Sequence, residues 1–185
     1  MLVGMIFSSL LLQGPRPEAV CVDLKGKTLI PLSRAQPNPP KATVLIFYLA
    51  HCPISQKLTP EINRIHKEFS AKGVKFYMVH EDLTLTSAEV AKEAKAFALT
   101  PPIVIDKWRS QKKMSGVMIS PEAVVYDSKF QPRYKGRIND LFYGLGKMRP
   151  KARTRDLRDA IANVVAGKAP ANSETQAIGC ILPKS

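Results

Sequence analysis

The sequence predicts an α/β protein in which helices flank both faces of a central mixed β-sheet. Residues 43–49 and 74–79 are apolar, β-branched runs of the kind that forms buried strands. Residues 53–72, which lie between them, repeat their apolar side chains at helical spacing. Short strands, a hairpin and a closing helix follow, and this order is typical of a mixed sheet covered by helices on its two faces.

The composition is that of one globular domain with a basic surface. The length of 185 residues is sufficient for a single sizeable core, and 45% of the residues are hydrophobic. A net charge of +13 is compatible with an acidic protein, a nucleic acid or an anionic membrane surface as partner. The densest basic run, 147–158, lacks the interleaved aromatic residues of a single-strand binding surface. We therefore expect a dispersed, solvated basic surface and no nucleic-acid partner, with association at a membrane surface as an alternative.

The N-terminal segment predicts export. Residues 1–12 are apolar but too few to span a bilayer as a helix, and the polar residues 13–18 follow them. This arrangement favours a signal peptide or N-terminal anchor over residues 1–20. No Lys or Arg precedes the apolar run and no clean cleavage site follows it, so an upstream strand or a misplaced start codon is the alternative. The folded domain is then expected over residues 21–167, with a C-terminal tail over 168–185.

The first half of the domain contains two predicted strands and a long helix. Residues 21–32 are expected to form a short strand or hairpin with Lys25–Lys27 as its turn, followed by a proline-rich loop over 35–41. The strand at 43–49 leads into a helix whose first turn accommodates Pro53. The inward stripe of this helix consists of Leu58, Ile62, Ile65 and Phe69.

Proline and capping signals mark the next elements. Pro60 lies inside the first helix and is expected to kink it. Thr86–Glu89 has the form of a capping box and begins a second helix that runs to about Ala98. Residues 103–105 are predicted to form a short strand, and 108–113 a polar, basic linker.

The last third is predicted to hold a hairpin and a closing helix. Residues 123–126 and 133–135 are expected to pair around a turn at Asp127–Lys129. The closing helix runs from about Arg155 to Ala166, with Thr154 as its cap.

The three cysteines are Cys21, Cys52 and Cys180, so at least one thiol stays unpaired within the chain. An oxidising compartment would permit one disulfide, and the residues alone do not select its partners. Cys180 lies in an apolar island, residues 177–182, of an otherwise polar tail. Such an island predicts that the tail docks on the domain.

Cys52 is the strongest candidate for chemistry because it lies where a buried strand meets a helix N-terminus. Unpaired backbone N–H groups and the helix dipole favour negative charge there, which stabilises the reactive thiolate and lowers the pKa of the cysteine. The adjacent His51 would assist as an imidazolium ion or as a neutral base. The alternatives are a buried, inert Cys52 and a solvent-facing loop residue at His51.

The segment Leu49–Ser55 resembles the active-site loop of the thioredoxin-like superfamily in a Cys-x-x-Ser form. Pro60, eight residues after the cysteine, matches the kinking proline of that family's active-site helix. Ser120–Glu122 resembles the family's Thr-Pro-Glu segment, whose proline is cis and packs beside the reactive cysteine.

Two later segments resemble the redoxins, the alkyl hydroperoxide reductase and thiol-specific antioxidant group. Tyr134 with Gly136–Asp140 is similar to their tyrosine-x-Gly-Arg-Ile-Asp-Asp stretch, and Ala177–Cys180 looks like the ending of exported bacterial members. The resemblance covers about residues 20–182. It implies a thioredoxin-like fold and a periplasmic or exported location in the bacterial cell envelope.

The resemblance also implies a thiol–disulfide oxidoreductase that uses Cys52, with His51 assisting. Its partners would be protein thiols or disulfides and a thiol reductant, and it needs no metal or organic cofactor. Pro53, Ser120 and Pro121 would contact the substrate, which pairs like a β-strand beside the cis proline.

The resemblance breaks at Ser55, where a dithiol enzyme carries the cysteine that resolves a mixed disulfide. Either the site works with a single thiol, or Cys180 returns as the resolving cysteine. A structural disulfide, such as one between Cys21 and Cys180, or an idle thiol is the alternative.

A peroxiredoxin-like thiol peroxidase is the nearest rival. That family places Pro and Thr seven and three residues before its reactive cysteine, whereas this chain has Leu45 and Leu49. Arg137 could polarise a peroxide oxygen, but its alternative role is to shape the end of the hairpin.

Two further functions stay open. A copper-delivery protein of the cytochrome-oxidase assembly type needs a second cysteine where this chain has Gln56, which leaves Cys52 and His51 with Met118 or His80 as soft ligands. A thioredoxin fold without its dithiol could also serve as a non-catalytic binding module.

Overall fold

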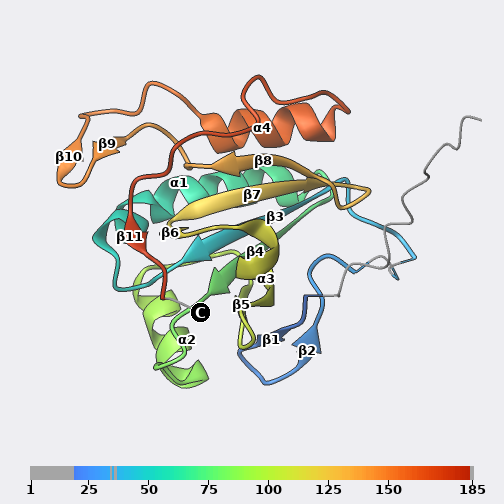
Figure 1. Ribbon diagram of the computed structural model, residues 1–185, viewed down its shortest axis with the longest axis vertical. Helices are drawn as coiled ribbons and strands as arrows, with labels where there is room; N and C mark the ends of the chain where they lie inside the picture. The colour runs from blue at the N-terminus through green and yellow to red at the C-terminus, as the bar shows by residue number, and fades with distance from the viewer. Residues whose placement is uncertain (1–18, 34, 36, 184–185) are drawn as a thin grey trace, which may run out of the picture.

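In the computed structural model, which describes residues 19–33, 35 and 37–183, a seven-stranded mixed sheet runs through the molecule (Figure 1). Its order is β2-β1-β5-β4-β3-β7-β8. The strands are β1 (Cys21–Asp23), β2 (Thr28–Leu29), β3 (Ala42–Tyr48), β4 (Val74–His80), β5 (Ile103–Ile105), β6 (Ile119–Ser120), β7 (Glu122–Asp127), β8 (Pro132–Gly136), β9 (Phe142–Gly144), β10 (Lys147–Met148) and β11 (Cys180–Ile181). The helices are α1 (Pro53–Ser70), α2 (Ser87–Ala96), α3 (Ser110–Ser115) and α4 (Asp156–Val165).

The centre of the sheet is β3, whose seven residues are all buried. It pairs in parallel with β4, where Tyr48 lies opposite His80, and antiparallel with β7, where Leu45 lies opposite Val124. A strand covered on both faces reads as a continuous apolar run, as this one does. The predicted mixed sheet is confirmed.

Helices cover the sheet on both faces, as predicted. Helix α1 lies behind the strands in Figure 1, where the ring of His66 packs edge-on against Phe76 of β4. Helix α4 lies beside α1, and the guanidinium of Arg158 joins the carboxylate of Glu68 across the two helices. Helix α3 lies in front, where Gln111 donates to the carbonyl oxygen of Ala19, just before β1.

The capping box of α2 is confirmed, since Thr86 and Glu89 exchange the two expected hydrogen bonds. The prediction that Thr154 caps α4 is wrong. Arg155 occupies that position without a side-chain cap, and the hydroxyl of Thr154 donates to the carboxylate of Asp156.

The predicted linker at 108–113 is also wrong, because residues 110–115 form the short helix α3. The carboxylate of Asp106 accepts the backbone N–H groups of Ser110 and Lys112 at 2.9 and 3.0 Å. Those bonds satisfy donors that a helix N-terminus otherwise leaves unpaired. The side chain that nucleates α3 lies outside the segment itself.

Two further pairs of short strands lie outside the main sheet. The hairpin of β9 and β10 was not predicted, whereas β11 docks antiparallel on β6 as the apolar island of the tail predicts. The expected leader over residues 1–20 falls almost wholly outside the described residues. Within the described part of the chain, no helix is both long and apolar enough to cross a bilayer.

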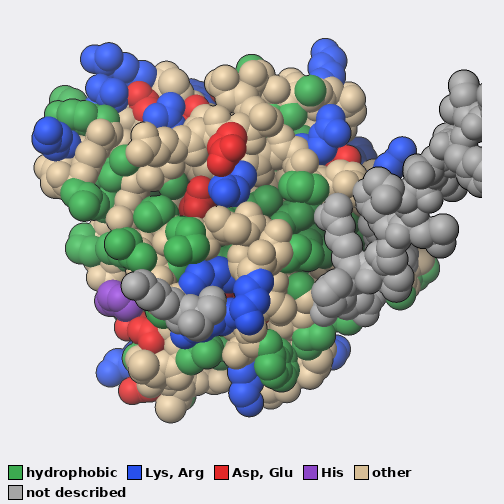
Figure 2. Space-filling model, viewed as in Figure 1, with side chains coloured by type: hydrophobic (Ala, Val, Ile, Leu, Met, Phe, Trp, Pro, Cys, Tyr) green, Lys and Arg blue, Asp and Glu red, His purple; other side chains and the backbone are tan. Residues whose placement is uncertain are grey.

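Lys and Arg side chains are dispersed over the face drawn in Figure 2. They lie at its margins and near its centre without merging into a single patch, and apolar side chains lie between them. On this face, the basic surface has the scattered form that the sequence predicts.

Candidate active site

Cys52 caps the N-terminus of α1, directly after the loop that leaves β3. Its backbone is extended, Pro53 takes the first helical position, and its carbonyl oxygen accepts the N–H of Gln56 at 3.0 Å. The Gln56 side chain donates back to the carbonyl oxygen of Ala50 at 2.7 Å, which ties the loop to the first turn. Cys52 is 0% exposed. The cysteine predicted from the sequence therefore lies between a loop and a helix that hydrogen bonds hold together.

Cys52 and Cys180 form a disulfide across a sequence separation of 128 residues, with their Cα atoms 6.0 Å apart. The third cysteine, Cys21, is a free thiol in the core. Burial and the nearby charge of Asp106 raise the pKa of Cys21 to about 12. The alternative pairing of Cys21 with Cys180 is not the one that the structure contains.

Ser120, at the end of β6, links α1, the loop after β3 and the tail. Its hydroxyl oxygen accepts the N–H of Leu49 at 2.7 Å and lies 3.0 Å from the hydroxyl of Ser55. Its carbonyl oxygen lies 3.4 Å from the sulfur of Cys52. Ser55 is 0% exposed, so the residue that replaces a second thiol acts as a buried link between α1 and β6.

The peptide bond between Ser120 and Pro121 is cis, as the resemblance implies. Ser120 pairs with Cys180, and Ile119 pairs with Ile181, in an antiparallel ladder. The backbone edge beside the cysteine is thus occupied by the chain's own tail. A substrate peptide that pairs there would take the same place.

His51 faces solvent rather than the sulfur atoms. Its side chain is 59% exposed, and its Nδ1 lies 3.8 Å from the carboxylate of Asp82. Hydrogen bonds from Thr84 hold the pKa of Asp82 below its ordinary value. The neighbouring His80 is buried at the end of β4, and burial lowers its pKa.

The tail has a distal anchor, residues 180–183, on the β6 edge. Leu182 is 1% exposed and donates its N–H to the carbonyl oxygen of Met118 at 2.9 Å. The carbonyl oxygen of Pro183 accepts from Arg109 at 3.4 Å and from the buried ammonium of Lys112. Figure 1 shows β11 running alongside β6 towards the C-terminus.

The tail also has a proximal anchor, residues 173–175, on β8. Lys135 donates its N–H to Ser173 and accepts the N–H of Thr175, at 2.9 and 3.0 Å. The hydroxyl of Thr175 accepts the N–H of Arg137 at 3.2 Å and lies 2.7 Å from the hydroxyl of Tyr134. A side chain at Gly136 would meet the Thr175 hydroxyl at 2.2 Å. Backbone contact this close requires glycine.

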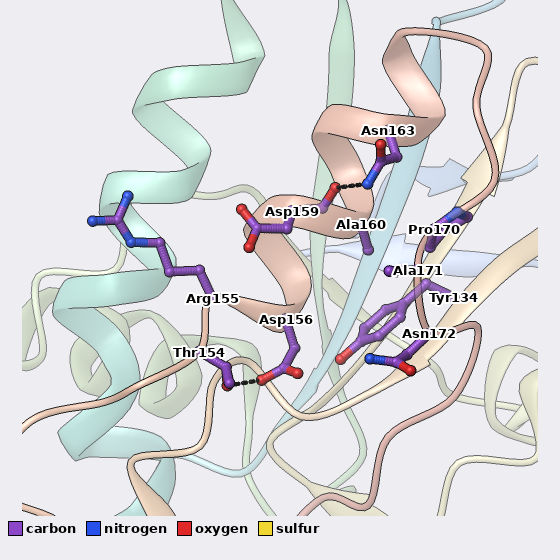
Figure 3. Close-up of a pocket in the computed structure, with 10 residues that line it drawn as sticks. All are labelled: Tyr134, Thr154, Arg155, Asp156, Asp159, Ala160, Asn163, Pro170, Ala171 and Asn172. Carbon is purple, nitrogen blue, oxygen red and sulfur yellow. Dashed lines mark hydrogen bonds between the residues drawn. The ribbon is translucent and has the colours of Figure 1, made fainter.

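A pocket opens where the tail leaves α4 (Figure 3). The ring of Tyr134 lies between α4 and the tail residues Pro170–Asn172, and the carboxylates of Asp156 and Asp159 line the helix side. None of the residues predicted for catalysis lines it. We assign it to the packing of the tail.

Glu81 and Asp106 form a buried pair of carboxyl groups, both 0% exposed, although their sequence positions do not suggest an obvious acid–base pair. They follow the neighbouring strands β4 and β5 directly. Burial, and then the charge of Asp106, raise the pKa of Glu81 to about 8. An acidic residue directly after each of two strands that pair in parallel is the sequence signal that could have revealed this pair.

The structure also places the residues that a peroxidase or a copper-binding protein would use. Leu45 and Leu49 are buried and place apolar side chains where a peroxidase would carry Pro and Thr. Arg137 pairs with Asp156 at 2.9 Å. Met118 is 53% exposed, and among the described residues no three His, Cys, Asp or Glu side chains group as a metal site.

Solved structures with this fold cover most of the chain. A hypothetical protein from Sinorhizobium meliloti 1021 is 22% identical, with a TM-score of 0.76 over 90% of each chain. An uncharacterised conserved protein from Geobacillus kaustophilus is 18% identical, with a TM-score of 0.74 over 91% of this chain and 89% of its own. A secreted Mycobacterium tuberculosis disulfide oxidoreductase, described as homologous to E. coli DsbE, is 15% identical, with a TM-score of 0.55 over 81% and 96%. These similarities establish the thioredoxin-like fold.

No curated protein sequence matches the chain significantly. The model of the AhpC/TSA family matches residues 15–140, a span that contains Cys52, Ser55, Ser120 and Pro121. Because this match covers well over half of the chain, the protein belongs to the AhpC/TSA family of redoxins.

Proposed function

We propose that the protein is a thiol–disulfide oxidoreductase in which Cys52 attacks a substrate disulfide and Cys180 resolves the resulting mixed disulfide. One observation carries the proposal: a cysteine at a helix N-terminus is joined to a cysteine on a separately anchored tail. Family membership and the disulfide oxidoreductases among the structural neighbours support a redox function. The tail cysteine supplies the second thiol that Ser55 does not.

The reaction proceeds by two exchanges of thiolate for disulfide. The Cys52 thiolate attacks one sulfur of a substrate disulfide, which forms a mixed disulfide and releases the other substrate sulfur as a thiolate. The Cys180 thiolate then attacks the sulfur of Cys52, which forms the disulfide seen here and releases the second substrate thiolate. The substrate gains two electrons and the cysteine pair loses two. An external dithiol restores the pair, and the reverse sequence oxidises a substrate dithiol.

The surroundings of Cys52 suit the attacking role. The first turn of α1 contains no acidic residue that would oppose a thiolate, and its free N–H groups stabilise negative charge. The same stabilisation makes Cys52 a good leaving group when the disulfide is reduced. His51 adds a positive charge at the rim of the site when it is protonated.

The location belongs to the same proposal. An envelope protein would meet an oxidising environment, in which the Cys52–Cys180 disulfide persists until a dedicated reductant opens it. The apolar residues 1–12 support export.

The proposal is tested by reduction of a protein disulfide in the presence of dithiothreitol, with three single variants. Wild type and Cys21→Ser should turn over, and Cys52→Ser should be inactive. Cys180→Ser, reduced and then freed of dithiothreitol before substrate is added, should form a stable mixed disulfide between Cys52 and the substrate, seen by mass spectrometry. Retention of activity by Cys52→Ser would overturn the assignment of the attacking cysteine.

A peroxide assay separates the nearest rival. The reduced protein is mixed with hydrogen peroxide, and closure of the disulfide is followed by the loss of free thiols. Closure that is far slower with peroxide than with a disulfide substrate supports the proposal. Closure that is faster with peroxide would assign a thiol peroxidase instead.

A further inference from the structure

Residues 179–182 show what kind of peptide the edge of β6 accepts, because they fill it themselves. Their backbone pairs antiparallel with Ile119 and Ser120, and their cysteine is bonded to Cys52. A substrate in a mixed disulfide with Cys52 has to place its own cysteine where Cys180 lies. The contacts made by the tail are therefore a template for the substrate.

The position before the cysteine accepts only glycine. A Cβ on Gly179 would lie 2.0 Å from the carbonyl oxygen of Ser120 and 2.7 Å from its carbonyl carbon. Both atoms are backbone at the end of β6, next to a buried network, so they cannot swing away as a side chain would. Any other residue would force the peptide backbone off the edge.

The position two residues after the cysteine is an apolar anchor. Leu182 is 1% exposed within the main core, whereas Ile181, which lies between Cys180 and Leu182, is 73% exposed. Alternate residues of a strand point to opposite faces, so this pattern is that of one buried and one free side chain. The buried position of Leu182 favours an aliphatic side chain, whereas the exposed position of Ile181 places no restriction on the residue.

The next residue contributes its backbone rather than its side chain. The carbonyl oxygen of Pro183 receives Lys112, which is 4% exposed, and Arg109. A buried ammonium that donates to a backbone carbonyl holds any peptide of the right direction and length. These two cations fix the register of the strand.

We infer that the edge of β6 is a binding site for an extended protein segment of the form Gly-Cys-x-aliphatic, and that the tail is its internal occupant. The inference rests on the proposed function and names its substrate class. Substrate and tail cannot pair with β6 together. The substrate has to displace the tail to reach Cys52, and the tail expels the reduced substrate when Cys180 attacks.

The test uses the full-length Cys180→Ser variant and a synthetic peptide, Ala-Ile-Gly-Cys-Ile-Leu-Pro, that copies residues 177–183. The peptide cysteine carries thionitrobenzoate as a mixed disulfide. The Cys52 thiolate attacks the peptide sulfur, a bond forms between them, and thionitrobenzoate leaves with the electron pair as a coloured thiolate. The release rate is measured for the parent peptide and three variants.

Replacement of glycine by alanine, or of leucine by serine, should lower the second-order rate at least about tenfold, through steric exclusion and the lost burial of one aliphatic side chain. Replacement of the exposed isoleucine by serine is the matched control and should leave the rate within about twofold. Equal rates for all four peptides would overturn the inference.

A small disulfide, bis-thionitrobenzoate, separates this inference from the proposed function. If it reacts with Cys52 while the four peptides react alike, the specificity is wrong and the exchange chemistry stands. If it does not react with the reduced protein, the proposed function itself fails. In the protein, Leu182→Ser on the Cys180→Ser background should raise the rate with the parent peptide several-fold, because the edge is vacated more often. An unchanged rate would show that the tail does not compete.

Discussion

The two anchors of the tail are held by different kinds of interaction. The proximal anchor, residues 173–175, is held by hydrogen bonds to Lys135, Arg137 and Tyr134 and by a close fit against Gly136. The distal anchor, residues 180–183, contains the two-residue strand β11 and is held by a disulfide, one buried leucine and two cations. Reduction removes the strongest link of the distal anchor and none of the proximal one. The contrast indicates that one end of the tail is a hinge and the other a detachable strand.

The largest effect should come from the disulfide itself. Chain entropy assigns about 5 kcal/mol to a cross-link that closes a loop of this length. Cys180→Ser should therefore lower the free energy of unfolding by several kcal/mol relative to oxidised wild type, measured by urea denaturation. Reduced wild type should match the variant. Equal stability of the oxidised and reduced proteins would show that the disulfide does not cross-link the native chain.

The pH dependence of stability should come from Glu81, which follows β4, and not from the tail. Burial, and then the charge of Asp106, raise the pKa of Glu81 from its ordinary value of 4.5 to about 8, so the folded protein retains a proton that the unfolded chain releases. Stability should fall as the pH rises from about 5 to about 8, by on the order of 3 kcal/mol. Glu81→Gln should remove this slope in unfolding experiments at several pH values.

Measuring that slope with and without dithiothreitol tests whether Glu81 responds to the state of the tail. Because Glu81 directly follows β4 of the main sheet and is not part of the tail, the slope should persist in the reduced protein. The matched control is Glu174→Gln, whose carboxylate is 71% exposed and should leave the slope unchanged. A slope that disappears on reduction would show that the protonation of Glu81 depends on the docked tail.

Hydrogen exchange should distinguish the two anchors directly. The N–H of Leu182 bonds to Met118, and the N–H of Thr175 bonds to Lys135. On reduction, exchange at Leu182 should accelerate about 100-fold by local opening, while exchange at Thr175 should change little. Acceleration at both positions would mean that the tail leaves as one unit.

The smallest effect should come from loosening the hinge. Thr175→Ala removes the hydroxyl that bonds to Arg137 and Tyr134 but leaves the two backbone hydrogen bonds to Lys135, so the proximal anchor should open more often. When it is open, the free arm that carries Cys180 grows from five residues, 176–180, to fifteen, 166–180. Effective concentration falls as about the three-halves power of length, so resolution of a mixed disulfide should slow by up to about fivefold.

Single-turnover release of the second substrate thiol measures that step. Ser173→Ala is the control, because Ser173 contributes its backbone carbonyl to the anchor. Unchanged release in Thr175→Ala would show that the proximal anchor does not position the tail.

Local patterns were sufficient to predict the framework of the site. Three features could be recognised from residues close together in the sequence. They are the buried run before Cys52, the amphipathic stripe after it and the capping box at Thr86. Helix α3 could not be predicted in this way. Asp106, which accepts its first N–H groups, lies only four to six residues before them, but the packing of α3 depends on the carbonyl oxygens of Ala19 and Val20, about 90 residues earlier.

The tail half of the site shows the same limit. The apolar island around Cys180 predicted docking, but three cysteines allow more than one pairing. The partner was selected by contacts on β6 and β8 that lie far from the tail in sequence, above all those of Ser120 and Gly136.

The closure of β11 over Cys52 also bears on chemical damage. A thiolate exposed to oxidants passes through sulfenic acid to sulfinic and sulfonic acids, of which the last two are not readily reversed. With the tail docked, Cys52 is 0% exposed and its sulfur is held in a reducible state. The buried Cys21 stays a neutral thiol, which is a poor target. Under the proposed function, the tail would therefore shield Cys52 between turnovers, and irreversible oxidation would be confined to the interval in which the strand is displaced.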